Sequence, residues 1–193
     1  MAHVTDMNNV IISIFELMDD SSTLAGLPRG EEAFTRLVRA ANKINGLTRV
    51  FLSFKNVDVA TASFLRESVL NFRTFCRGMK RDLYPIVADA NIDIIDELSE
   101  LLKLMGDAIV SCELSNEGIA SGVRIIGRLE EKQTVALQAV LEAGEADAGT
   151  LAEKYQDVEP TAWNNRLTSL VVKGILVELR KGRAKYYKPV LEM

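Results

Sequence analysis

Two groups of polar side chains near the carboxyl end of the chain have the residue types that contact nucleic acids. Segment 161–173 carries hydroxyl, amide and basic side chains, namely Thr161, Asn164, Asn165, Arg166, Thr168, Ser169 and Lys173. Segment 181–185 adds Lys181, Arg183 and Lys185. Asparagine can bond the edge of adenine, serine and threonine can bond several bases, and arginine and lysine meet phosphates. The combination predicts a surface that contacts DNA.

A helix is expected to position the first group. At about 100° per residue, the apolar side chains of 161–174 fall on one side. They are Trp163, Leu167, Leu170, Val171 and Gly174. Asn165 and Ser169 lie opposite, while Arg166 and Lys173 occupy one edge and Thr168 the other. An ordinary solvated helix face has a similar composition, so this alternative stays open.

A hairpin is expected to position the second group. The apolar run 175–179 predicts a strand, and a return strand ends at Pro189. Gly182 permits the positive φ of a tight turn. The basic side chains at this turn would reach a minor groove or flanking phosphates. Lysines also occur on exposed hairpins as protection against edge-to-edge pairing, which is the alternative explanation.

The charge is unevenly distributed along the chain. The 193 residues carry a net charge of −4, which is unlike a nonspecific nucleic-acid coat. Within 166–188, Glu178 is the only acid. The basic residues there are Arg166, Lys173, Arg180, Lys181, Arg183, Lys185 and Lys188. The basic charge therefore lies on the segment that is expected to contact DNA.

The preceding residues alternate between predicted strands and helices, which argues for an α/β sandwich. Strands are expected at 9–17, 48–54, 84–88 and 108–114, and helices at 31–43, 64–78 and 91–105. A loop is expected at 19–30. Residues 115–127 read as a boundary with room for a short strand. Beyond it, helices are expected at 133–143 and 148–155, the second with Asp147 as its N-cap.

Catalytic, cofactor and metal sites are not indicated. His3 is the single histidine, and Cys76 and Cys112 are far apart, so we expect no metal site and no enzyme activity. The acids from Asp89 to Glu100 mimic a calcium loop, but Ile94 stands where that loop needs glycine. No nucleotide-binding glycine motif occurs. Without a signal peptide or an apolar span, a cytoplasmic protein is expected.

Two resemblances follow from these segments. Residues of about 129–191, with TLAEKY, TAWNNRLTSLVVKGIL and RKGRAKYYKPV, resemble the winged helix-turn-helix DNA-binding domains of bacterial regulators. Residues of about 8–127, with FKNVDVATASFLRESV, look like a STAS-like domain of the anti-sigma-factor-antagonist type. Laid on this chain, the phosphate-accepting serine of that family falls on Ser63. The positions of the family's acid and glycine hold Thr61 and Phe64. The alternative makes Ser63 the N-cap of a helix starting at Phe64.

These resemblances imply a STAS-like domain at 1–127 and a winged-helix domain at 128–193. The expected function is DNA binding by a bacterial transcriptional regulator that acts as a homodimer. Its front domain would receive a partner or signal, with Ser63 as a candidate switch. The alternative is a protein-interaction or partner-switching scaffold that does not bind DNA, which the acidic net charge favours.

Overall fold

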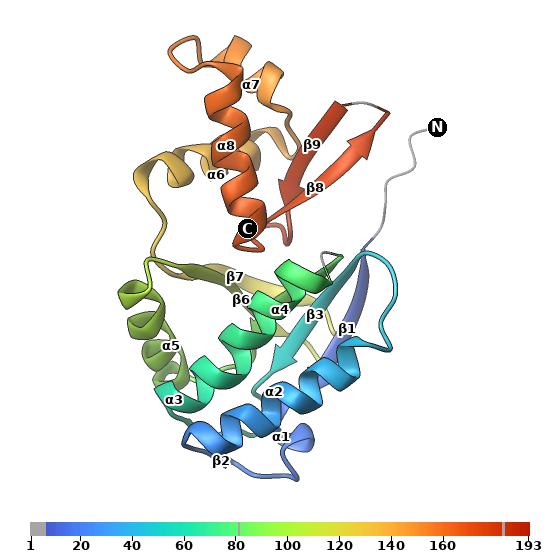
Figure 1. Cartoon of the computed structure of the whole chain (residues 1–193), viewed down its shortest axis with the longest axis vertical. Helices are drawn as coiled ribbons and strands as arrows, with labels where there is room; N and C mark the ends of the chain where they lie inside the picture. The colour runs from blue at the N-terminus through green and yellow to red at the C-terminus, as the bar shows by residue number, and fades with distance from the viewer. Residues whose placement is uncertain (1–6, 81, 183) are drawn as a thin grey trace.

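The computed structural model describes residues 7–80, 82–182 and 184–193, and it is a mixed α/β fold around a mostly parallel sheet (Figure 1). The five strands lie in the order β1-β3-β5-β6-β7. Their bounds are β1 Asn8–Ser13, β3 Thr48–Ser53, β5 Leu83–Ala88, β6 Ala108–Leu114 and β7 Ala120–Gly127. The first four strands run parallel, and β7 pairs antiparallel with β6.

The helices that connect the strands cover one face of the sheet. They are α2 Leu27–Ala41, the continuous helical run of α3 Ala62–Leu65, η1 Arg66–Leu70 and α4 Asn71–Met79, and α5 Ile92–Leu104. Each parallel strand adds on the same side of the last, and right-handed crossovers then place every connecting helix on one face. Side chains alternate accordingly: Val50 and Leu52 pack in the core with these helices, whereas Phe51 points to the opposite face.

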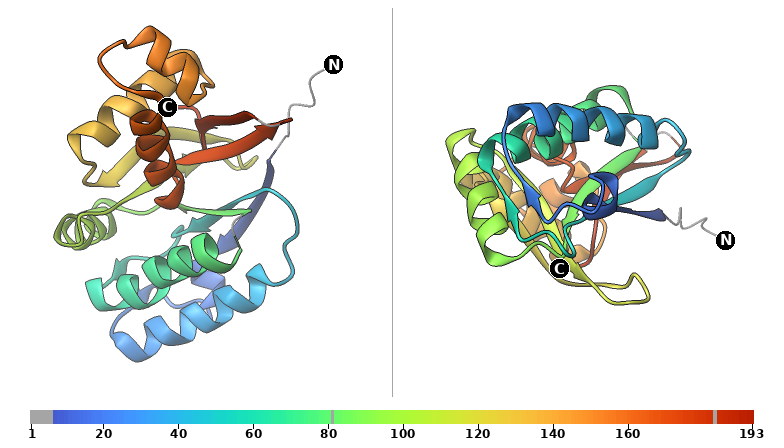
Figure 2. Two further views of the ribbon diagram at one scale, coloured as in Figure 1. Left: turned by 45° about the horizontal axis from the view of Figure 1, so that its top comes forward. Right: turned by 90° about the horizontal axis from the view of Figure 1, so that it is seen from below.

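Residues 128–193, here called the C-terminal unit, cover that opposite face (Figure 2). The unit contains α6 Glu131–Ala143, α7 Ala148–Lys154, α8 Pro160–Val172, and the hairpin of β8 Leu176–Lys181 and β9 Ala184–Pro189. One apolar cluster joins Phe51, Ile86 and Val110 of the sheet to Trp163 and Tyr187 of this unit. The C-terminal unit and residues 8–127, here called the sheet unit, therefore share a core.

Two glycines mark places where backbones approach closely. A Cβ on Gly30 of α2 would lie 2.7 Å from the Cβ of Glu67 in η1. A Cβ on Gly127 would lie 2.3 Å from the carbonyl oxygen of Asp107, and Gly127 also has a φ of +96°. Gly127 ends the sheet unit, so the chain enters the C-terminal unit through a tight contact with the turn before β6.

Several predicted boundaries were wrong. The strand expected at 9–17 ends at Ser13, whose side chain accepts from the Glu16 N–H and caps the short helix α1 Ile14–Leu17. The loop expected at 19–30 contains the two-residue strand β2 Thr23–Leu24 and the first turn of α2, where Pro28 suits a helix start. β2 pairs parallel with β4 Val59–Ala60.

The stretch 115–127, predicted as a boundary with room for a short strand, contains the eight-residue strand β7. Its alternation was hidden because Gly122 interrupts it and most of its side chains are exposed or half-buried. The predicted Asp147 cap is confirmed: its carboxylate accepts from the N–H groups of Gly149 and Thr150. None of the described helices is long and apolar enough to cross a membrane.

Candidate nucleic-acid interface

Helix α8 is fixed by its apolar face. Trp163, Leu167 and Leu170 are buried between α8 and the rest of the C-terminal unit. The Trp163 ring lies 5.4 Å from the ring of Tyr155, which ends α7. Pro160 occupies the first turn of α8 and suits a helix start. This packing determines which side chains of α8 face outward.

The first two turns of α8 present polar side chains to solvent. Thr161 and Asn165 are both exposed, and they lie four residues apart on one face of the helix. No hydrogen bond within the described structure engages either side chain. Thr161 and Asn165 are thus available to donate and accept hydrogen bonds at the edge of a base pair.

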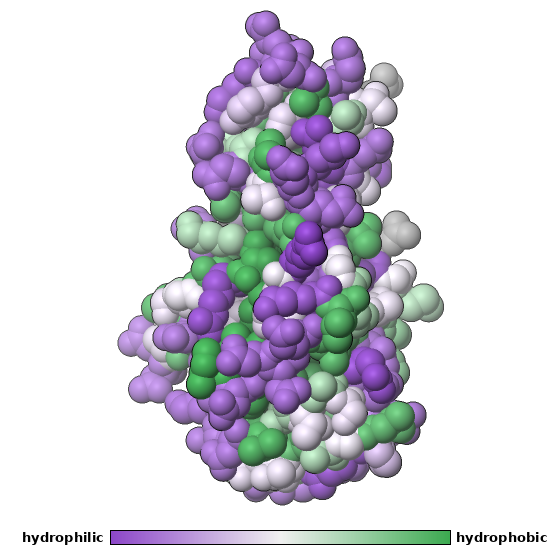
Figure 3. Space-filling view, turned by 90° about the vertical axis from the view of Figure 1, so that its left-hand side faces the viewer, coloured by the Kyte–Doolittle hydropathy of each residue, from purple (hydrophilic) through white to green (hydrophobic). Residues whose placement is uncertain are grey.

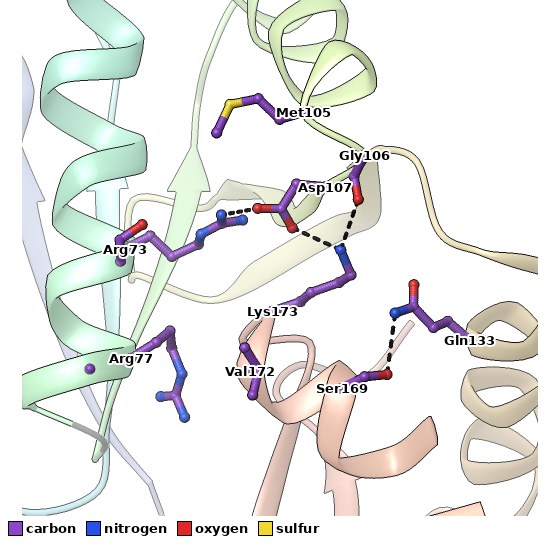
Figure 4. A pocket seen from close by; sticks show the side chains of 11 residues that line it. Arg73, Arg77, Met105, Gly106, Asp107, Gln133, Ser169, Val172 and Lys173 are labelled. Carbon is purple, nitrogen blue, oxygen red and sulfur yellow. Dashed lines mark hydrogen bonds and ion pairs between the residues drawn. The ribbon is translucent and has the colours of Figure 1, made fainter. Parts of the chain in front are cut away.

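The last turns of α8 are bound inside the molecule (Figure 4). Ser169 donates to the carbonyl of Arg166 and accepts from Gln133 of α6 at 3.2 Å. Lys173, just beyond α8, donates to the Gly106 carbonyl at 3.1 Å and forms an ion pair with Asp107 at 3.0 Å. Its side chain is only 14% exposed. Lys173 therefore holds the two units together, and Ser169 ties α8 to α6 within the C-terminal unit, so neither side chain faces a ligand on the surface of α8.

The side chains of Asn164, Arg166 and Thr168 are half-buried. The Asn164 carbonyl accepts from the Tyr187 hydroxyl at 3.0 Å, which ties α8 to β9. The Arg166 guanidinium lies 5.2 Å from the centre of the Trp163 ring. Thr168 lines a cavity against Tyr84 of the sheet unit. Arg166 keeps its charge near the surface, whereas Asn164 and Thr168 face other parts of the chain.

The hairpin lies beside α8 and carries the other predicted contacts. Gly182 at its turn has a φ of +66°, as the tight turn requires. Lys181 forms an ion pair with Glu145 and lies over the Tyr186 ring. Lys185 forms an ion pair with Glu178 at 3.0 Å. Arg183, which is also predicted to contact DNA, lies outside the described residues.

The C-terminal unit is electrically balanced as a whole. Residues 128–193 contain ten basic and ten acidic side chains, so the net charge of −4 belongs to the first 127 residues. Three of the described hairpin cations form ion pairs with acids of the same unit: Lys181 with Glu145, and Lys185 and Arg180 with Glu178, the last at 3.7 Å. Phosphates would therefore have to displace these acids to engage the hairpin.

Ser63 does not cap its helix. Thr61 is the N-cap: its hydroxyl oxygen accepts from the Phe64 N–H at 3.5 Å, and the helix begins at Ala62. Ser63 is half-buried in the first turn, and its hydroxyl lies 3.1 Å from that of Thr61. The sequence suggested Ser63 as the cap because the helix was expected to start at Phe64, where the serine hydroxyl would satisfy a free backbone N–H. The Thr61 hydroxyl oxygen also accepts from the Gly26 N–H at 3.2 Å, which helps to hold this side chain at the start of the helix.

Among the described residues, no three metal-ligating side chains come together in a way that could hold a metal ion. Burial raises the pKa of the Cys76 thiol to about 12, although Arg77 and Lys80 oppose the shift. Burial also raises the pKa of the Cys112 thiol to about 12, and the charges of Asp89 and Glu113 add to it. Both thiols are therefore protonated at neutral pH and poor nucleophiles.

Asp107 joins the two units and was missed by the sequence reasoning. Its carboxylate pairs with Arg73 of α4 and with Lys173, and its backbone carbonyl accepts from the Arg128 N–H at 2.8 Å. Burial by itself raises the pKa of Asp107, but the charge and hydrogen bond of Arg73, with bonds from Ala108 and Lys173, bring it below the ordinary value. The only local signal was its position after Gly106, which ends a helix.

No protein-family model, curated protein or solved structure matches the chain. Roles for individual residues therefore rest on the geometry of this chain alone.

Proposed function

We propose that the C-terminal unit is a winged helix-turn-helix that binds double-stranded DNA, and that the STAS-like sheet unit controls it in a transcriptional regulator. The observation that carries the proposal is the pair of exposed polar side chains, Thr161 and Asn165, on the first two turns of α8. Support also comes from the order of three helices and a hairpin in residues 131–189. In helix-turn-helix proteins the N-terminal residues of the recognition helix contact base edges.

The residues divide into reading and positioning roles. Asn165 would bond a base edge from the major groove, with Thr161 beside it. Arg166, Lys181, Arg183 and Lys185 would meet phosphates and fix the register of the protein on the duplex. Ser169 and Lys173 leave the predicted DNA-contacting set because the polar contacts that they make are internal. Asn164 and Thr168 support the helix from the side that faces the hairpin and the sheet unit.

Two turns of one helix reach few base pairs, so we propose that the protein acts as a homodimer on two half-sites. The two copies of α8 would then lie about 34 Å apart, one helical turn of DNA. Light scattering coupled to size exclusion, with and without duplex, measures this stoichiometry. Two chains per duplex support the arrangement, and one chain per duplex contradicts it.

Fluorescence anisotropy against genomic fragments at low salt tests DNA binding directly. If the hairpin and α8 contact about four phosphates, affinity falls about a hundredfold between roughly 50 and 200 mM salt. Asn165→Ala should lower the discrimination between best and worst fragments by about 1–3 kcal/mol. Lys103→Ala, which removes an exposed side chain of α5, serves as the control and should change neither quantity. No binding to any fragment at low salt contradicts the proposal.

A second candidate is a protein-interaction module that does not bind DNA. The ion pairs that Lys181 and Lys185 make with acids of their own unit favour it, because they reduce the charge offered to phosphates. A stoichiometric protein partner whose binding survives Lys181→Glu and Lys185→Glu favours this second function. Loss of fragment binding in the same variant favours DNA.

A further inference from the structure

A cavity of about 680 Å³ lies where the two units meet. Its walls come from α4, the turn between α5 and β6, α6 and the end of α8, so both units contribute (Figure 4). The volume is in the range of small-molecule sites. The cavity opens beside Val172 and Met105, and the glycines 78 and 106 in its wall leave space where side chains would otherwise stand.

Positive charge exceeds negative charge in the cavity wall. Arg73, Arg77 and Lys173 line it together with a single carboxylate, that of Asp107. The side chain of Arg73 is 7% exposed and that of Lys173 is 14% exposed, so the charges act in a region that water screens weakly. The ends of α4, α5 and α8 also face this region, but partial charges of about half a unit each do not cancel the excess.

Apolar side chains stand beside these cations. Met105 is 54% exposed and Val172 is 64% exposed, and both belong to the cavity wall. Leu104, next to Met105, is 88% exposed. Figure 3 shows apolar surface at mid-height, between the hydrophilic upper part of the molecule and the lower part. A ligand that complements both the cations and the apolar side chains of the cavity wall needs a negative group and an apolar body.

We propose that the cavity binds a small organic carboxylate with an apolar body. The Arg73 guanidinium already donates to Asp107 and to the Ala108 carbonyl, so the carboxylate would bond its remaining N–H donors and lie near the guanidinium of Arg77. Lys173 adds a third positive charge. The apolar body would lie on Val172 and Met105 and remove their exposed surface from water.

Such a ligand would touch both units at once. Arg73 and Met105 belong to the sheet unit, whereas Val172 and Lys173 belong to the C-terminal unit. A ligand that binds the folded arrangement and not the unfolded chain stabilises it by mass action. The site therefore gives the sheet unit a means of sensing a metabolite that also fixes the position of α8. This inference goes beyond DNA binding, and its test uses the protein alone.

The test is isothermal titration calorimetry of the full chain with benzoate, benzyl alcohol and inorganic phosphate at constant ionic strength. Benzoate has both the charge and the ring, benzyl alcohol lacks the charge, and phosphate lacks the apolar body. We expect saturable binding of one benzoate per chain, at least about tenfold tighter than either comparison compound, because only benzoate combines charge-assisted hydrogen bonds with burial of an apolar ring. Equal binding of phosphate and benzoate, or no benzoate binding, overturns it.

Variants locate the site. Val172→Glu places a like charge at the rim of the cavity on an exposed position, so folding is retained and benzoate affinity should fall at least about tenfold. Val135→Glu is the matched control because Val135 is also exposed, on α6, and does not line the cavity. Lys173→Met should weaken benzoate binding as well. Equal affinities of Val172→Glu and Val135→Glu for benzoate would contradict the assignment.

Discussion

The two halves of α8 differ in what their polar side chains do. The outer half, residues 160–166, presents Thr161 and Asn165 to solvent. The inner half, residues 167–172, directs Ser169 to Gln133, and Lys173 just beyond its end reaches Asp107. Both halves have a similar polar composition in the sequence. The difference comes from what packs against each half, because Ser169 meets α6 and Lys173 reaches the turn before β6, whereas Thr161 and Asn165 meet solvent.

The outer half of α8 is a surface that can contact DNA. Lys173, at the end of the inner half, belongs with Arg73 and Asp107 to a charged cluster, here called the joint, that connects the two units. Arg73 and Lys173 are largely buried, and Asp107 is the carboxylate that both cations reach. Buried charges are tolerated when they are paired, and removal of one partner leaves the others uncompensated. Substitutions in the joint should therefore change stability, and substitutions in the outer half should change only recognition.

The largest effect is expected from Asp107→Ala. The change leaves the Arg73 and Lys173 charges without their carboxylate, so the free energy of unfolding should fall by about 3–5 kcal/mol. Urea denaturation followed by circular dichroism measures it. Asp96→Ala is the control, since Asp96 is an exposed acid on α5. A loss no larger than in the control would mean that the joint does not hold the units.

A smaller loss is expected from Gln133→Ala. Gln133 donates to Ser169 and its carbonyl also accepts from the Glu130 N–H at the start of α6. Removing both bonds should lower the free energy of unfolding by about 1–2 kcal/mol. The exposed Gln138 on α6 provides the matched substitution, Gln138→Ala, which should cost less in the same urea experiment.

The joint should also depend on pH. The pKa of Asp107 is lowered in the folded protein, so its contribution is complete above the unfolded value of about 3.9 and is lost as pH falls below it. The stability difference between the wild type and Asp107→Asn should therefore shrink between about pH 5 and pH 3. Urea titrations of both proteins across this range measure it. A constant difference would show that the ionised carboxylate is not what stabilises the joint.

The smallest effect on stability is expected in the outer half. Thr161→Ala and Asn165→Ala alter exposed side chains, so the free energy of unfolding should change by no more than about 0.5 kcal/mol each. Thermal unfolding checks this. A loss above about 1 kcal/mol in either variant would place that side chain in the packing of the fold and remove it from the reading surface.

Local periodicity was enough to predict much of the fold. The strand at 108–114 and the helix at 91–105 agree with β6 and α5 to within a residue at each end, because alternating or helically spaced apolar residues mark them. The burial of Trp163 was predicted for the same reason. Tyr187 is also buried, since the side chains along β9 alternate between its two faces.

Contacts between distant segments could not be predicted in this way. Lys173 and Asp107 are 66 residues apart, and nothing near either residue indicates the other. β7 is recognised only once it pairs with β6, since Gly122 interrupts its alternation. Thr61 caps its helix partly because β2 brings Gly26 within reach. The sequence thus predicted which residue types form the DNA-contacting surface. Contacts with α6, β9 and the sheet unit then remove Ser169, Asn164 and Lys173 from it.

Binding of genomic DNA fragments by three proteins tests most directly whether the outer half of α8 contacts DNA and Lys173 does not. The wild type, the Thr161→Ala/Asn165→Ala double variant and Lys173→Met would be compared by anisotropy at low salt. We expect the double variant to discriminate less among fragments, by about 1–3 kcal/mol for each base contact removed. Lys173→Met should keep both the discrimination and the salt dependence of the wild type. Loss of DNA affinity in Lys173→Met with an unchanged double variant would contradict the central claim.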